Sequence, residues 1–444
     1  MAKKLIYLLI ISVLMAGTLF ACAPKTAEEP AAPAAEKPTE AEAPAAEEEQ
    51  VTLTYWQVPN HPEMQALVEG LLEPFEEQNP NIKVEVVIIP WSDVETMWVS
   101  AIQSGETPDV GYPLAPLQMY RMGGLEPLDE YLDQEFLDTI LKGPLEAGIY
   151  DGKLYALPML VSSDTLYYNK DMFEAAGIEL PDPMYSPSWE EFLDWNLKLK
   201  EAGYYGWDWG MRTMWDHTIW DVYRRFGVDE TNADYTEVTF DTPEALAWAQ
   251  AVQDLAQTYA VLPPKALTVD WNRSESFLEG ESAMVEFWAG LAGQLEEYPD
   301  INWGVCKPFH GPGDNGEATG AYLAIGSTVM FKDSKHKEEA AELIKFIHSP
   351  EFTLEWNKQV GTFPAVQGGN AIFDDATPEK KEVANVIWSL LESGEAEFYY
   401  EWEGVTRWAQ ESFLPNWQSL MLGEMTPENF CKKVTEDGNR IINE

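Results

Sequence analysis

The hydrophobic pattern of the first part of the folded chain alternates between strand and helix periods. Residues 51–56 and 82–89 are predicted to form strands, and apolar residues recur at helical spacing between them and again over 91–104. A third strand is predicted to begin at Asp109, after a turn. This alternation is typical of a doubly wound α/β domain, in which ligands bind beyond the carboxyl ends of the strands. The loops expected at this ligand-facing rim are 56–61 and 112–116.

A polar interruption divides an apolar stretch in the middle of the chain. Strands are predicted over 154–158 and 165–168, and Ser162, Ser163 and Asp164 stand between them. An apolar run would be expected to continue at these three positions if they only filled a core.

Three helix starts carry recognisable sequence signals. Asn169 precedes one helix, and Ser188 with Glu191 forms a capping box before a helix over 189–202. A helix over 243–259 has proline at its first position, where the missing N–H costs nothing.

The first 21 residues have the pattern of a targeting segment that is removed from the mature protein. Lys3 and Lys4 supply positive charge, and the apolar run over 5–14 is too short for an ordinary membrane span. Cys22 ends a lipobox-like sequence in which Phe20 is bulkier than usual. We expect Cys22 to carry the lipid anchor; the alternative is a plain signal peptide and a leftover buried cysteine.

Residues 22–50 are predicted to form a tether between the lipid and the folded body. They consist mainly of Ala, Pro and Glu, with eight Glu against Lys25 and Lys37. Such a segment cannot bury enough apolar surface to fold, and its like charges keep it extended.

Residues 51–444 form a chain longer than a single hydrophobic core usually supports, so two lobes are expected.

The whole chain has a formal charge of −48. Without the two signal-peptide lysines and the six excess negative charges of the tether, −44 remains on the lobes. Nucleic acids and anionic surfaces are therefore poor partners on electrostatic grounds.

The cysteine count leaves two alternatives open. After lipidation of Cys22, Cys306 and Cys431 remain, an even number that permits one disulfide in an exported protein. One hypothesis is that Cys306 and Cys431 form a disulfide. The alternative is that both remain separate buried thiols.

The segments KLYALP and LYYNKDMFEAAGIELP, followed by SWEEFLDWNLKLKEAG, resemble the family 1 extracellular solute-binding proteins, the maltose-binding-protein-like sugar receptors of ABC importers. The resemblance extends over nearly all of 51–444. It implies an α/β, two-lobe periplasmic-binding-protein type II fold, in which each lobe is a mixed sheet flanked by helices and three crossovers form a hinge. The implied lobes are 51–163 with 325–365, and 164–324 with 366–444.

The resemblance also implies an extracytoplasmic, lipid-anchored monomer that carries a sugar to permease subunits without a cofactor or metal. The hinge would close around the ligand, which selects the closed state. The residues expected to contact the ligand are Asn60, His61, Tyr112, Ser162, Ser163, Asp164, Trp215, Asp216, Trp288 and Trp402. For Asn60 and Ser162, a plain role in loop capping is the alternative.

Tryptophan is concentrated between Trp207 and Trp220, where it alternates with aspartate. Indole faces bind the C–H faces of sugar rings and carboxylates bind hydroxyls, so this composition suits a sugar-binding cleft. The helical spacing of Trp220 and Tyr223 favours a core position for Trp220. A core role also remains open for Trp215 and for Trp288.

A secreted carbohydrate-active enzyme is the main alternative class of protein, and a binding protein for a non-sugar solute is the other alternative. Acidic groups beside aromatic residues are also typical of glycoside hydrolases, which need a pair of carboxylates at a defined separation. No motif isolates such a pair, and the Gly-x-Ser-x-Gly, His-Glu-x-x-His, Walker and Cys-x-x-Cys patterns are missing from the sequence. The sequence therefore favours a binding protein.

Overall fold

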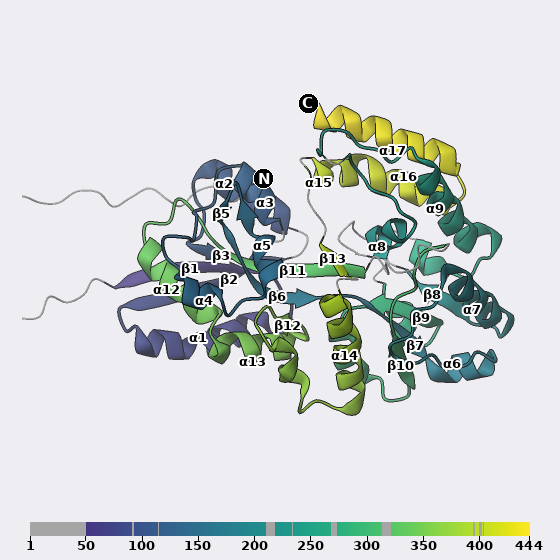
Figure 1. Ribbon diagram of the computed structural model, residues 1–444, viewed down its shortest axis with the longest axis horizontal. Coiled ribbons are helices and arrows are strands. Elements are labelled where there is room, and N and C mark those ends of the chain that lie inside the picture. The colour runs from purple at the N-terminus through teal and green to yellow at the C-terminus, as the bar shows by residue number, and fades with distance from the viewer. Residues whose placement is uncertain are drawn as a thin grey trace, which may run out of the picture. The chain divides into compact units, whose positions relative to one another are not determined.

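Two β-sheets organise the described part of the chain (Figure 1). The first sheet has the strand order β12-β6-β11-β3-β1-β2, with β13 pairing β11, and the second has the order β10-β7-β9-β8. Beyond residue 48 the chain forms one unit. The computed structural model describes residues 50–90, 93–113, 115–209, 218–232, 234–267, 273–312, 321–393, 396–398, 402 and 404–444.

The strands of the two sheets come from separated parts of the sequence. The first sheet contains β1 (Val51–Gln57), β2 (Ile82–Ile88), β3 (Val110–Gly111), β6 (Ala156–Ser162), β11 (Ala321–Met330), β12 (Phe363–Pro364) and β13 (Ala396–Phe398). The second contains β7 (Thr165–Asn169), β8 (Tyr205–Asp208), β9 (Ser282–Phe287) and β10 (Trp303–Cys306). A small hairpin joins β4 (Ile149–Tyr150) and β5 (Lys153–Leu154).

A first hydrophobic core packs helices against the first sheet. Its buried residues include Leu53 on β1 and Trp98, which stacks on Phe331 with ring centroids 5.4 Å apart. The helices that contribute to it are α1 (Met64–Gln78), α2 (Val94–Ser104), α3 (Pro116–Arg121), α4 (Gln134–Leu137), α5 (Lys142–Glu146), α12 (Lys337–Ile347) and α13 (Pro350–Val360).

A second core, rich in aromatic residues, packs helices against the second sheet. Trp248 stacks on Trp417, with ring centroids 5.1 Å apart, and both indoles are fully buried. Its helices are α6 (Lys170–Ala175), α7 (Trp189–Glu201), α8 (Thr218–Arg225), α9 (Pro243–Gln253), α15 (Val405–Trp408), α16 (Leu414–Met421) and α17 (Pro427–Ile442), with the turns η1 (Asp254–Thr258), η2 (Pro264–Leu267) and η5 (Ala409–Phe413).

A third cluster, which we call the hinge core, joins the two sheets. It combines Val161 on β6, Phe363 on β12, Tyr167 on β7 and Val285 on β9. It also includes residues of β10 and β11 and of α10 (Glu275–Leu278), α11 (Gly290–Gln294), α14 (Pro378–Ser393), η3 (Leu295–Glu297) and η4 (Gly369–Phe373). Within the described residues, none of the helices combines the length and apolar character needed to cross a membrane.

The predicted α/β start of the chain is confirmed. β1 pairs in parallel with β2 and β3, and α1 and α2 lie between them in sequence. The capping box also forms: the Ser188 hydroxyl accepts from the Glu191 backbone N–H, and the Glu191 carboxylate accepts from the Ser188 N–H. The capping box therefore starts α7 at Trp189, as the sequence predicts.

The chain passes between the two sheets at three places. β6 ends at Ser162 and β7 begins at Thr165, so Ser163 and Asp164 form the first passage. The chain returns between β10 and β11, and leaves the first sheet again after β12 for α14, which packs against β7 and β10.

Two elements differ from the sequence prediction. The strand expected over 154–158 is split: β5 ends at Leu154, and β6 continues through Ser162 because β11 pairs with it as far as the Ala324–Ser162 position. The helix expected over 243–259 ends as α9 at Gln253 and continues as the π-helical turn η1.

Candidate functional site

The hinge passage is buried and polar. Ser162, Ser163 and Asp164 have exposed fractions of 2%, 1% and 4%. The Ser163 hydroxyl lies 3.5 Å from the Asp164 carbonyl oxygen. The Ser162 hydroxyl is buried without a hydrogen-bond partner among the described residues. A buried hydroxyl in this state gains free energy from any ligand group that can pair with it.

Asp164 is already paired within the protein. Its carboxylate accepts two hydrogen bonds from the Arg273 guanidinium, one of them from Nη2 to Oδ1 at 3.3 Å. The guanidinium also lies over the Phe287 ring, 4.5 Å from the ring centroid. Sequence reasoning missed Arg273, because it is distant from Asp164 in the chain and lies in no motif.

A second buried ion pair lies deeper in the same part of the molecule. Arg225 on α8 donates to both carboxylate oxygens of Glu286 on β9, at 2.7 and 2.9 Å. Burial raises the pKa of nearby Asp221 well above its ordinary value, and the Asp164 and Glu286 carboxylates add to this effect while Arg225 and Arg273 oppose it. Asp221 is thus held toward its neutral form, which offsets the excess of carboxylates over arginines in this cluster.

Trp288 directly follows β9 and lies beside the hinge passage. Thr165 pairs with Phe287, so the next residue in the register comes beside Asp164. The Tyr167 hydroxyl donates to the Trp288 carbonyl oxygen at 3.1 Å. The indole is partly exposed and packs against the first core, whereas most tryptophans of the second core are fully buried.

The predicted rim after β1 and β3 brings Asn60, His61 and Tyr112 onto the same end of the first sheet. The Tyr112 N–H donates to the Trp56 carbonyl oxygen at 2.9 Å, which ties the two strand ends together. Asn60 and His61 are partly exposed. Tyr112 is only 5% exposed, and burial raises the pKa of its hydroxyl.

Trp402, which was expected to contact the ligand, is only 2% exposed. Its side chain is buried in the second core, where Nε1 donates to the Glu230 carboxylate at 2.9 Å and the ring packs against Trp408. The indole is therefore engaged within the protein. Trp215, Asp216 and Cys22 lie outside the described residues.

The predicted disulfide is wrong. Cys306 on β10 and Cys431 on α17 are both free thiols, and both are buried in the second core. Burial raises the pKa of both thiols, to about 12 for Cys431. The alternative of two separate buried thiols is confirmed, and both are held in the unreactive protonated form.

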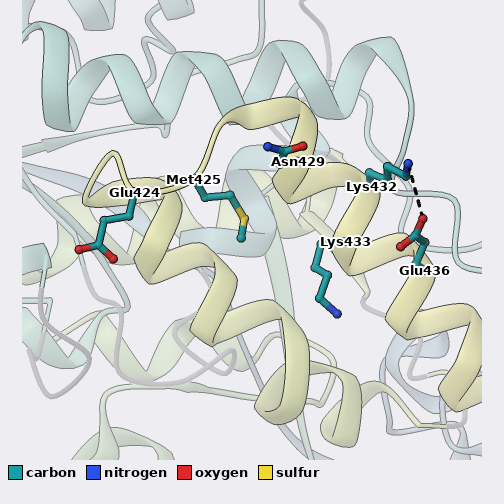
Figure 2. A pocket seen from close by; sticks show the side chains of 6 residues that line it. All are labelled: Glu424, Met425, Asn429, Lys432, Lys433 and Glu436. Atoms are coloured by element: carbon teal, nitrogen blue, oxygen red, sulfur yellow. Dashed lines mark ion pairs between the residues drawn. The ribbon is translucent and has the colours of Figure 1, made fainter.

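A shallow hollow on the surface of α17 contrasts with the hinge (Figure 2). Its lysines are exposed and already paired: Lys432 lies 3.8 Å from Glu436, and Lys433 lies 2.6 Å from Asp437. The residues that line it are Glu424, Met425, Asn429, Lys432, Lys433 and Glu436.

The described part of the chain contains no cluster of His, Cys, Asp and Glu that could hold a metal ion.

Comparison with known proteins places these features in a family. Residues 59–353 match the model of the bacterial extracellular solute-binding proteins. A protein of Brucella abortus named as a binding protein is 27% identical over 382 residues, covering 84% of this chain and 89% of its own. The sn-glycerol-3-phosphate-binding periplasmic protein UgpB of Salmonella paratyphi A is 24% identical, covering 67% of this chain and 70% of its own.

Solved structures show the same fold. The Listeria monocytogenes ABC substrate-binding protein Lmo0181, in complex with cycloalternan, aligns with a TM-score of 0.77 at 23% identity, covering 89% of this chain and all of that one. Maltose-bound MalE3 of T. maritima aligns with a TM-score of 0.73 at 23% identity, covering 88% and 99%. The two sheets and their three crossings are thus the two-lobe periplasmic-binding-protein architecture, and the chain belongs to the bacterial extracellular solute-binding protein family.

Proposed function

We propose that this chain is the solute receptor of an ABC importer and that its solute is a neutral saccharide. The observation that carries the proposal is the position of a partly exposed indole, Trp288, beside buried hinge hydroxyls, of which Ser162 has no partner among the described residues. An aromatic face with a few convergent polar groups is the usual composition of a small-molecule site. Sugar-bound structural neighbours support the same substrate class.

A phosphorylated polyol is the second candidate, because a UgpB relative binds sn-glycerol-3-phosphate. The charged residues near the described hinge do not favour a phosphorylated ligand. Arg273 and Arg225 are buried and each is paired with a carboxylate, Asp164 or Glu286. A phosphate would have to take an arginine from its buried partner and leave that carboxylate uncompensated, which costs several kcal/mol.

The deciding experiment is a thermal-shift screen followed by calorimetric titration on the wild-type protein. We expect maltotriose or a related neutral oligosaccharide to raise Tm by mass action, and sn-glycerol-3-phosphate to leave it unchanged. A shift with the phosphate alone would contradict the saccharide assignment. Release of reducing sugar from the oligosaccharide during incubation would instead indicate a glycoside hydrolase.

The anchoring part of the proposal rests on Cys22. A diacylglyceryl thioether with a further N-acyl chain binds a membrane firmly, whereas one chain alone is marginal. We expect Cys22→Ser to release the protein from the membrane or to leave its precursor uncleaved. Detergent-phase partitioning tests this, and a variant that partitions like the wild type would contradict lipidation at this residue.

A further inference from the structure

Two glycines meet where the end of α13 approaches the loop that carries Trp288. Gly361 caps α13 in the left-handed conformation, with φ of 81°. A Cβ atom built on Gly361 would lie 3.0 Å from the Gly290 Cα and 3.2 Å from the Gly290 nitrogen. These are backbone atoms, so neither can rotate aside as a side chain would. A side chain at position 361 would therefore have to push the Gly290 backbone aside.

Gly290 in turn supports the indole. A Cβ atom built on Gly290 would lie 3.0 Å from Cε2 and 3.1 Å from Cζ2 of Trp288. The indole therefore lies directly along the Gly290 backbone. Movement of this backbone would move the ring.

The end of α13 is itself fixed to the hinge strand β6. The Asn357 amide donates to the Thr353 carbonyl oxygen at 2.8 Å and to the Met159 carbonyl oxygen on β6 at 3.4 Å. The Thr362 hydroxyl donates to Asn357 Oδ1 at 2.7 Å. Asn357 and Thr362 are both buried, so the helix end that carries Gly361 is held rigidly.

From this path we propose that Gly361 is a positioning residue for Trp288. The contacts run from β6 through Asn357 and Gly361 to Gly290 and the indole. Ser162 is the last residue of β6, so these contacts fix the distance between the indole and the Ser162 hydroxyl. The proposal rests on the saccharide function proposed above. It assigns to Gly361 an effect on binding without any contact with the ligand.

Gly105 offers a matched control. It caps α2, which has the same length as α13, in the same left-handed conformation, with φ of 71°. A Cβ atom built there would meet only the Asp333 carboxylate, at 3.9 Å, which is ordinary contact. Gly361→Ala and Gly105→Ala therefore introduce the same kind of backbone strain, and only the first pushes on the Trp288 loop.

The first test measures maltotriose binding by calorimetry. We expect Gly361→Ala to raise Kd about tenfold, the size expected when one platform contact is misplaced, and Gly105→Ala to leave Kd unchanged. In a Trp288→Phe background, the added Gly361→Ala change should have a much smaller effect, because its action passes through the indole. Equal effects of the two alanine variants, or an undiminished effect in the Phe background, would overturn the proposal.

The second test needs no ligand, so it separates this proposal from the saccharide assignment. With fluorotryptophan in the protein, the Trp288 fluorine resonance is identified by its loss in Trp288→Phe. We expect Gly361→Ala to shift this resonance and Gly105→Ala to leave it in place. An unmoved resonance in Gly361→Ala would overturn the positioning role. If the wild-type protein binds no neutral saccharide, the assigned solute is wrong, and the resonance still decides whether Gly361 positions the ring.

Discussion

Among single residues of the hinge, some polar groups are already paired and others remain available. Asp164, predicted as a ligand contact, is held by Arg273, and both are buried. The Ser162 hydroxyl and the partly exposed Trp288 ring remain for a ligand. The site that these residues suggest is therefore electrically balanced, with an aromatic surface and a hydroxyl.

We expect Trp288→Ala to weaken binding far more than folding. Loss of an aromatic contact at the centre of a site typically costs about 2 kcal/mol or more, which is roughly a thirtyfold rise in Kd. The ring is partly exposed, so the free energy of unfolding should fall by much less than the ~3–5 kcal/mol typical of a core aromatic truncation. Calorimetric titration and urea unfolding of the same variant measure both quantities.

Trp417→Ala is the matched control, because that indole is fully buried in the second core. Its free energy of unfolding should fall by the ~3–5 kcal/mol typical of a core aromatic truncation. The protein that remains folded should bind the ligand almost normally. A Trp288 variant that behaves like this control would show that Trp288 is a core residue.

His348 should make folding sensitive to mild acid. It is buried at the end of α12, and burial lowers its pKa to about 3. Below pH 6.5 the His348 imidazole binds a proton in the unfolded chain but stays neutral in the folded one. The free energy of unfolding therefore falls as the pH falls, by up to about 1.4 kcal/mol per pH unit. Urea unfolding at pH 7 and pH 5.5 should show this loss in the wild type and a smaller one in His348→Gln.

The control is His336→Gln, at the other end of the same helix, where the side chain is partly exposed. It should leave the pH dependence close to that of the wild type. If His348→Gln keeps the full wild-type loss between these two pH values, the titration of His348 is not its source.

Which individual side chains could be predicted depended on how local their environment is. Trp288 was predicted through the family resemblance of the segment that contains it, and its contact with a ligand stays a prediction. Arg273 and Glu230, the partners of Asp164 and Trp402, are 109 and 172 residues away from them, and no local pattern connects such pairs. The sequence therefore identifies Asp164 as a polar residue at the hinge, but it does not show that Asp164 forms an ion pair within the protein.

At the scale of elements, the buried pair of Arg225 and Glu286 joins α8 to β9, the strand that leads to Trp288. Both side chains have zero exposure, and the guanidinium also lies 4.3 Å from the centroid of the Phe309 ring. Such a pair holds two elements in one relative position, although its net contribution to stability is small because both charges are desolvated.

We expect Glu286→Gln to lower the free energy of unfolding by about 3–5 kcal/mol, because Arg225 is left buried without its partner charge. The double variant Arg225→Met with Glu286→Leu should recover most of this loss, since it removes both desolvated charges. Urea unfolding of the single and double variants forms the test.

The comparison is Asp194→Asn, which breaks an exposed ion pair with Lys198 on α7. Exposed pairs of this spacing contribute about 0.3–0.5 kcal/mol, so its effect should be small. A Glu286→Gln variant as mild as Asp194→Asn would mean that Asp221, 3.8 Å from Arg225, replaces Glu286 as its counterion.

The elements themselves were predicted best where their signals are local. The capping box fixes the start of α7, and the alternating patterns give β1 and β2 nearly to the residue. The extension of β6 through Ser162 and the pairing of β13 with β11 were missed, because both depend on a strand distant in sequence. Tertiary pairing, more than local propensity, determines such strands.

At the scale of the whole molecule, the net charge of −44 on the lobes is the dominant electrostatic feature. Self-repulsion of this size destabilises a compact state, and salt screens it over about 10 Å at 0.1 M. We therefore expect NaCl to raise Tm in the absence of ligand. Thermal unfolding in a chloride series and in a matched sulfate series measures the effect and separates screening from specific anion effects. A flat or falling Tm between low and moderate NaCl would contradict it.

The two buried thiols have a consequence for how the chain reaches its folded state outside the cytoplasm. In the folded protein Cys306 and Cys431 are free, buried and protonated, so an oxidising compartment has little access to them. Before folding, both thiols are exposed to disulfide exchange, and a bond between them would be non-native. If the chain is exported as proposed above, an oxidised population would form only while the chain is still unfolded. Fast folding would then protect the protein from this non-native disulfide.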